Sequence, residues 1–150
     1  MIKIYIIWDS FKHFQIPIDE YLKRFWKKVK IIKIKPSKSW TKGQIIEKDT
    51  ENLNKILQKS QDFNALLSLN WNQFTSEEIA HKIISKNLNF WKPISFFIWW
   101  AFWLDEKKLV NINLKISLWK ITLPHWLALL VLLEQIYRSF QILENRDYHY

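Results

Sequence analysis

Cysteine is absent from this sequence of 150 residues, and long apolar runs are absent too. Without cysteine there is no disulfide, thiolate zinc site or cysteine nucleophile, a composition that suits a reducing cytosol. Only five apolar residues follow Lys3, too few for the apolar core of a signal peptide. The longest uncharged apolar stretches, residues 94–104 and 127–133, fall short of the roughly 20 residues that a membrane span needs. We therefore expect a soluble, cytoplasmic protein.

Glycine is almost absent as well, while tryptophan is abundant. The chain has one glycine, Gly43, and ten tryptophans, whereas average usage of about 7% predicts roughly ten glycines at this length. Glycine adopts positive φ at low cost, so a folded chain ordinarily needs it at tight turns. The composition is otherwise that of a folded protein, at 49% hydrophobic and 25% charged. We expect a single domain over residues 1–150.

Acidic residues are missing from residues 23–42, which hold nine lysines and arginines. Outside this segment basic and acidic residues balance at 14 each, so the segment accounts for the whole formal net charge of +9. A stretch of one sign attracts polyanions such as nucleic acid or an anionic membrane. It equally suits a solvated, lysine-rich surface. The lack of a long amphipathic basic helix disfavours binding to a membrane surface.

Short apolar runs alternate with helical stripes along the chain. Thr75 and Glu78 form a capping box at the start of one helix, and Glu134 and Arg138 lie one turn apart in the last helix. The alternation predicts an α/β fold with a parallel-rich sheet flanked by helices. Strands are predicted at residues 2–7, 31–34, 63–69, 94–98 and 114–118, and helices at residues 18–29, 42–60, 75–86, 105–110 and 124–143.

Tryptophan stands at several predicted strand ends, where a sharp turn ordinarily favours glycine. Trp71 follows the third strand, Trp99 and Trp100 follow the fourth, and Trp119 follows the fifth. Ligands of parallel α/β sheets bind beyond the carboxyl ends of the strands, so these loops are candidate binding loops. The same aromatic residues could instead form a stacking platform for bases, an interfacial anchor or part of the core.

Three motifs in the C-terminal half resemble those of a known family. They are Ile121-Thr122-Leu123-Pro124-His125, Leu133-Glu134-Gln135-Ile136-Tyr137-Arg138-Ser139, and Asn145 followed by Tyr148-His149. Residues 21–25 and the strand end at residues 67–69 match as well, so the chain resembles the RlmH family over nearly its whole length. Members of that family are SPOUT-superfamily methyltransferases that methylate N3 of a pseudouridine in large-subunit ribosomal RNA.

The sequence departs from the family pattern where that pattern has glycine. Residues 98–104 correspond to the family's I-G-G-x-x-G-L stretch. We hypothesise that the tryptophans at these positions are glycine in the native protein, because UGA is one base from the glycine codon GGA and a few bacterial lineages read UGA as glycine. The alternative is a homologue with genuine tryptophans, each costing on the order of 1 kcal/mol where φ is positive. The substituted positions are Trp8, Trp71, Trp91, Trp99, Trp100 and Trp103.

The resemblance implies a SPOUT-like fold with a C-terminal trefoil knot, in about residues 66–150, and S-adenosyl-L-methionine as cofactor. Glycine would let the backbone of three knot loops approach the cofactor closely. An indole at Trp100 would fill that pocket, so the alternative function is a non-enzymatic RNA-binding SPOUT homologue. The cofactor-binding residues implied by the resemblance are Leu69, Asn70, Trp99, Trp100, Trp103, Trp119, Lys120, Ile121, Thr122, Leu123 and Pro124.

The resemblance also implies the substrate and the partners, which are 23S rRNA in the ribosome and a second copy of the chain in a homodimer. Arg138 would hold phosphate or the uracil carbonyls, and Tyr148 or His149 would orient the base or assist removal of the N3 proton. Asp147 replaces the family's usual proline, and a terminal Tyr-His pair is otherwise typical of a frayed end. We expect no metal site and no membrane partner. The RNA phosphates would contact Lys23, Arg24, Lys35, Lys38 and Lys42.

Overall fold

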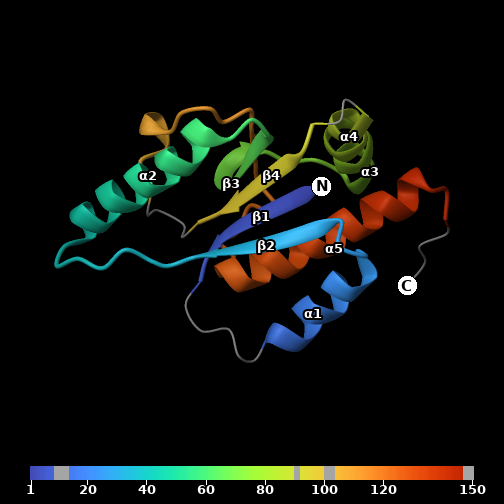
Figure 1. Ribbon diagram of the computed structural model, residues 1–150, viewed down its shortest axis with the longest axis horizontal. Coiled ribbons are helices and arrows are strands. Elements are labelled where there is room, and N and C mark those ends of the chain that lie inside the picture. Colours follow the sequence, from blue (N-terminus) through green and yellow to red (C-terminus); the bar gives the residue numbers. More distant parts are fainter. Residues whose placement is uncertain (9–13, 90–91, 100–103, 147–150) are drawn as a thin grey trace.

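The computed structural model spans residues 1–150. It describes all of them except 9–13, 90–91, 100–103 and 147–150, and it does not describe the side chains of Asn70 and Leu88. The described strands form one parallel sheet in the order β2-β1-β4-β3-β5 (Figure 1). The predicted α/β class with a parallel sheet is therefore confirmed. The strands are β1 (Ile2–Ile7), β2 (Val29–Ile34), β3 (Phe63–Asn72), β4 (Ile94–Ile98) and β5 (Leu114–Ile116).

Helices connect these strands at the places that the sequence predicts. The predicted capping box is present, because the Thr75 hydroxyl accepts from the backbone N–H of Glu78 and the Glu78 carboxylate accepts from the backbone N–H of Thr75. The helices are α1 (Gln15–Arg24), α2 (Lys42–Lys59), α3 (Ser76–Glu78), the π-helix η2 (Ile79–Ser85), α4 (Lys86–Asn89), the 3-10 helix η3 (Glu106–Lys108) and α5 (His125–Leu143).

Several predicted boundaries are wrong, two of them for reasons of backbone conformation. The first helix was expected to run to Val29, but it ends at Arg24 because Trp26 and Lys27 have left-handed φ angles of 46° and 64°. Val29 then begins β2. The third strand was expected to end near Leu69 but continues to Asn72, which pairs with β5 across a shift in register.

The sheet is covered on both faces, as a parallel sheet requires. On one face, side chains of α1, η2 and α5 pack against β1, β3 and β4 in the larger core cluster. On the other, Leu53 and Leu57 of α2 pack against Ile7, Leu66 and Phe97. All five residues of β4 are buried, because this strand lies inside the sheet between β1 and β3.

Helix α5 is rich in apolar residues. Among the described residues it alone is long and apolar enough, by length and composition, to cross a membrane. Seven of its residues are buried. Leu129, Leu132 and Leu133 are among them and pack in the core cluster with the sheet. The predicted Glu134–Arg138 ion pair is present on this helix, at 2.6 Å. A buried core helix satisfies the same length and hydropathy test, so α5 by itself is weak evidence for a membrane span.

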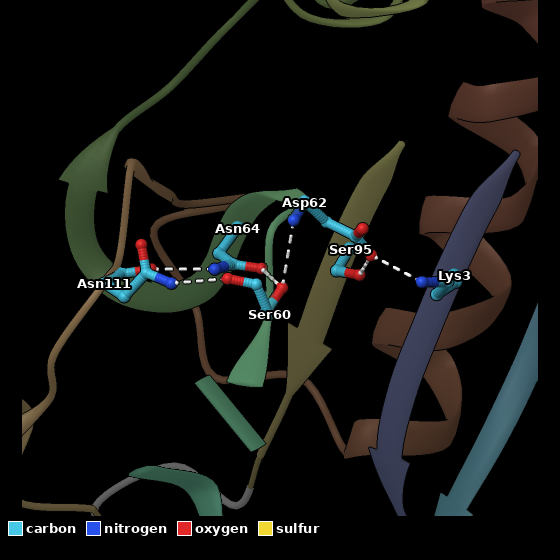
Figure 2. A network of polar contacts seen from close by, with 6 residues as sticks. All are labelled: Lys3, Ser60, Asp62, Asn64, Ser95 and Asn111. Carbon is cyan, nitrogen blue, oxygen red and sulfur yellow. Dashed lines mark hydrogen bonds and ion pairs between the residues drawn. The ribbon is translucent and has the colours of Figure 1, made fainter. Parts of the chain in front are cut away.

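A polar network ties together the amino-terminal ends of β1, β3 and β4 (Figure 2). The Asp62 carboxylate accepts hydrogen bonds from the Lys3 ammonium at 2.8 Å and the Ser95 hydroxyl at 2.6 Å. The Ser60 hydroxyl bonds to both the Asp62 backbone N–H and the Asn64 side chain. The buried Asn64 amide in turn donates to the backbone carbonyl of Asn111, in the loop before β5, at 2.9 Å. The network therefore joins the neighbouring strands β1, β4 and β3 to the loop that leads into β5.

The carboxyl group of Asp62 is ionised more easily in this network than in water. Burial would raise the pKa of Asp62, but hydrogen bonds from Lys3 and Ser95 and the charges of Lys3 and the N-terminal amine outweigh it and lower the pKa. The hydrogen bond to Asp62 raises the pKa of Lys3. A lowered carboxyl pKa stabilises the folded state above the unfolded value of about 3.9, and this contribution is lost as the pH falls through the folded pKa.

We expect Asp62→Asn to lower the free energy of unfolding at pH 7 by about 1 to 2 kcal/mol, because the variant cannot form the charged hydrogen bonds to Lys3 and Ser95. The difference from the wild type should shrink below about pH 4, where the carboxyl of the unfolded chain takes up a proton, and should vanish as the pH falls through the lower pKa of the folded protein. Urea unfolding followed across this pH range measures both effects. Glu20→Gln, which removes an exposed ion pair with Lys23, is the control and should leave stability nearly unchanged. A wild-type advantage of constant size from pH 7 to 3 would contradict the prediction.

Candidate functional site

A cavity of about 550 Å³ lies beyond the carboxyl ends of β3, β4 and β5. Parallel strands end at one edge of a sheet and their loops then diverge, which leaves room for a ligand. The walls are mainly apolar, with Leu67 from β3, Ile98 from β4 and Ile116 from β5. Polar groups on the same walls come from Ser68, Asp105, Glu106, Lys107, Ser117 and His125. An apolar cavity with a few convergent polar groups is the usual form of a small-molecule site.

Glu106 connects three of the segments that surround the cavity. Its carboxylate accepts hydrogen bonds from the Ser68 hydroxyl of β3 and, at 3.0 Å, from the Lys115 ammonium of β5. It also accepts from the Trp71 indole N–H at 3.2 Å. The neighbouring Asp105 backbone N–H donates to Thr50 on α2 at 3.0 Å. These contacts hold the segment after β4 against both neighbouring strands and place a carboxylate in the cavity wall.

Ser117 fixes the two other loops relative to each other. Its buried hydroxyl lies 3.0 Å from the backbone carbonyl of Leu69 and 2.8 Å from that of Trp119. Its backbone N–H donates to the carbonyl of Asn72 at 3.0 Å. The end of β3 and the loop after β5 are thus joined at the cavity by one side chain.

The structure brings together several of the predicted cofactor-binding residues. Lys120, Thr122 and Pro124 belong to the same loop but do not line the cavity, and Trp100, Trp103 and the side chain of Asn70 lie outside the described residues. That these residues bind a cofactor therefore stays a prediction. Those that line the cavity are Leu69, Trp99, Trp119, Ile121 and Leu123.

The described tryptophans leave the cavity open. The Trp99 indole is 6% exposed, packs in the core cluster beside α2 and donates to the Asp49 carboxylate at 3.2 Å. Trp119 is 63% exposed at the other wall. The expectation that an indole at Trp100 fills the pocket falls outside the described residues.

The predicted catalytic residues do not all meet at the cavity. Arg138 donates through Nε and Nη2 to the same Glu134 oxygen, at 2.9 and 2.6 Å. It lies ten residues along α5 from Ala128, the nearer of the two α5 residues that line the cavity, and a helix of that length spans about 15 Å. Tyr148 and His149 lie outside the described residues. One copy of the chain thus holds Arg138 away from its own cavity.

The basic segment includes Lys30 and Lys33, which are exposed on β2 itself, and two further groups that lie beyond the ends of the strand. Lys23 and Arg24 end α1, and Lys28 precedes the start of β2. Lys35, Lys38 and Lys42 follow the other end of the strand and are exposed. Six residues of strand separate the groups by about 20 Å. The second group lies at the edge where the carboxyl ends of the strands and the cavity are found.

The site residues predicted from the sequence did not include five polar residues of the cavity wall: Asp105, Glu106, Lys107, Ser68 and Ser117. The only signal for three of them was the predicted short helix at residues 105–110, which directly follows the tryptophan-rich stretch. Ser68 had no signal, because its partner Glu106 is 38 residues away in the sequence.

The fold and the cavity define a parallel α/β protein with a small-molecule site at the carboxyl edge of its sheet. Comparison with known proteins makes this assignment specific. A family described as "Predicted SPOUT methyltransferase" matches residues 2–149. The chain belongs to the SPOUT methyltransferase family, and this membership implies the trefoil knot.

Named relatives are similar over nearly the whole chain. "Ribosomal RNA large subunit methyltransferase H" of Mycoplasmopsis pulmonis is 42% identical over 141 residues, covering 92% of this chain and 91% of the relative. The protein of the same name from Clostridium botulinum is 38% identical over 146 residues, with the same coverage. A "Putative ribosomal RNA large subunit methyltransferase H" of Methanococcus maripaludis is 34% identical over 146 residues, again covering 92% and 91%. These similarities confirm the resemblance that the sequence motifs indicated.

Proposed function

We propose that this protein transfers a methyl group from S-adenosyl-L-methionine to N3 of a pseudouridine in 23S rRNA. Family membership and the names of the relatives support a ribosomal RNA methyltransferase. The observation that carries the proposal is the open cavity, which is lined by residues from all three loops that the family motif assigns to the cofactor. The cytoplasm, where ribosomes work, is the proposed location.

The cavity suits the chemistry of S-adenosyl-L-methionine. Leu67, Ile116 and Ala128 offer apolar surface to an adenine ring. The carboxylates of Asp105 and Glu106 complement a positively charged sulfonium and ammonium group or accept from ribose hydroxyls. When bound, the cofactor supplies the methyl group. The protein's part is to exclude water, align the acceptor nitrogen in line with the methyl group and remove the N3 proton.

A homodimer is part of the proposal, because it would complete the site. Arg138 is held by Glu134 on α5, about 15 Å along the helix from Ala128, which lines the cavity of its own chain. A second copy packed along α5 could bring its Arg138 and C-terminal residues to that cavity. The apolar side chains of Leu127 and Val131 precede Glu134 and Arg138 on one stripe of α5 and are half-buried. An apolar stripe of this kind suits an interface between two copies.

Ribosomal RNA is the polyanion that the basic segment would bind in this proposal. Lys35, Lys38 and Lys42 are exposed near the edge of the sheet where the cavity lies. Lysines there would contact phosphates, which position the RNA without reading its sequence. Target choice would then come from the shape of the RNA around the pseudouridine.

We further propose that the tryptophans at the family's glycine positions, and Trp26, are glycine in the native protein. Trp26 supports this, because it follows the end of α1 with a φ of 46° and a side chain that is 86% exposed. Glycine is the usual residue where a helix ends in the left-handed conformation. Mass spectrometry of the protein isolated from its own organism decides the matter, since intact tryptophans would refute the proposal.

The function is tested with purified large ribosomal subunits and radiolabelled S-adenosyl-L-methionine. We expect the label to enter 23S rRNA at a pseudouridine. Glu106→Gln should weaken cofactor binding in calorimetry by about tenfold, equivalent to about 1.4 kcal/mol, because it removes a carboxylate from the cavity wall. Glu47→Gln, on the exposed surface of α2, should bind as the wild type does. A protein that binds RNA but neither the cofactor nor the label would support the non-enzymatic homologue instead.

The homodimer is tested with Val131→Glu, which places a charge in the apolar stripe of α5. We expect sedimentation to show a dimer for the wild type and a monomer for the variant. Methylation should be lost, whereas cofactor binding in calorimetry should persist because the cavity belongs to one chain. Val110→Glu, at an exposed position outside α5, should remain a dimer. An active monomer would contradict the composite site.

The backbone strain at Trp26, which has a left-handed φ, is tested with Trp26→Gly in the protein of the printed sequence. We expect this change to raise the free energy of unfolding by about 0.5 to 1 kcal/mol, because glycine tolerates the positive φ and the exposed indole contributes little packing. Trp40→Gly is the control: Trp40 is 99% exposed and its φ is not positive, so it should gain no stability. Equal effects of the two changes would contradict the strain argument.

A further inference from the structure

A second cavity, of about 380 Å³, lies at the opposite edge of the sheet from the first. Its walls come from the end of α1, the turn before β2 and the last turns of α5. The backbone carbonyl of Lys28 accepts from the N–H of Ile2 at the start of β1, which places this cavity beside the amino-terminal ends of the strands. Three cations line it, Arg24, Lys28 and Arg146, with Glu144 as the single carboxylate.

Aromatic rings hold two of these cations in place. The Arg24 guanidinium lies over the rings of Tyr21 and Tyr137, at 5.6 and 5.5 Å from their centroids. The Lys28 ammonium lies 5.3 Å from the centroid of Phe140. A ring attracts a cation through its face and consumes none of the N–H donors. Both cations are thus oriented while keeping donors for an anion.

The third cation is brought to the cavity by the turn that ends α5. Asn145 has a left-handed φ of 50°, and the Arg146 backbone N–H donates to the carbonyl of Gln141 at 3.0 Å. This turn directs the chain back over the end of the helix. The Arg146 guanidinium pairs with Glu144 at 3.1 Å, so one carboxylate offsets one of the three positive charges around the cavity.

We propose that this cavity binds a phosphate group of the RNA backbone through Arg24, Lys28 and Arg146. The inference rests on the proposed function, which supplies the RNA. A guanidinium offers a planar fork of donors that matches phosphate oxygens, and an ammonium adds a compact charge. The site draws Arg146 from outside the basic segment and lies about 20 Å from the lysines that follow β2. The RNA would therefore contact each chain both here and at the carboxyl end of β2, with the exposed Lys30 and Lys33 of the strand between them.

The test compares the wild type with the double variant Lys28→Gln, Arg146→Gln in binding to purified large ribosomal subunits over a series of salt concentrations. Each neutralised phosphate contributes about 0.7 to 0.9 to the slope of log affinity against log salt, so loss of this one phosphate contact should lower the slope by about 0.7 to 0.9. Lys55→Gln, Lys86→Gln makes the same change of net charge at exposed positions and should keep the wild-type slope. Binding of S-adenosyl-L-methionine should be equal in all three proteins.

The outcomes separate this inference from the proposed function. A wild type that neither binds nor methylates large subunits overturns the proposed function and this site with it. If the wild type does both and the double variant keeps the wild-type slope, the phosphate site alone is overturned. The same holds if the double variant only unfolds more easily, because it has lost a cation near the end of α5. Binding of inorganic phosphate to the wild type and to the double variant is the last measurement. Saturable binding of it by the wild type alone, without a change in subunit binding, would make this a site for free phosphate and overturn the RNA contact.

Discussion

Backbone pairing of β4 with β1 on one side and β3 on the other is the interaction on which the rest of the molecule depends. All five residues of β4 are buried, so the strand is held by packing on both faces as well as by its two ladders. Because the paired strands are parallel, β3, β4 and β5 all end at one edge. The cavity exists where their loops diverge, and Ile98 and Ile116 line it as the last residues of their strands.

The parallel arrangement of the strands also decides where the charged groups lie. At the amino edge of the sheet, the half-buried Asp62 is matched by Lys3, since an uncompensated carboxylate there would destabilise the fold. At the carboxyl edge, Glu106 is matched by Lys115 while still facing the cavity. The cations of the basic segment remain at the surface on either side of β2, where solvation makes like charges tolerable and leaves them available to a polyanion.

Local sequence patterns correctly predicted contacts between residues that are close in the sequence. The Thr75 capping box and the Glu134–Arg138 pair involve residues three and four apart, and both are present. The end of α1 was missed because it depends on left-handed backbone at Trp26 and Lys27, which periodicity does not show and which a glycine would have signalled. The Ser68–Glu106 and Trp99–Asp49 contacts were missed because 38 and 50 residues separate the partners.

The sequence by itself determined the α/β class, the positions of the strands and the family, because hydrophobic period and contiguous motifs are written along the chain. It also showed an excess of tryptophan and a shortage of glycine, with one glycine and ten tryptophans. Only the tertiary structure decided that Glu106 lines the cavity, that Arg138 is held away from it and that the basic segment extends along β2 and beyond both of its ends. Those features depend on strand order and on the direction of each element, which arise from packing between residues that are distant in the sequence.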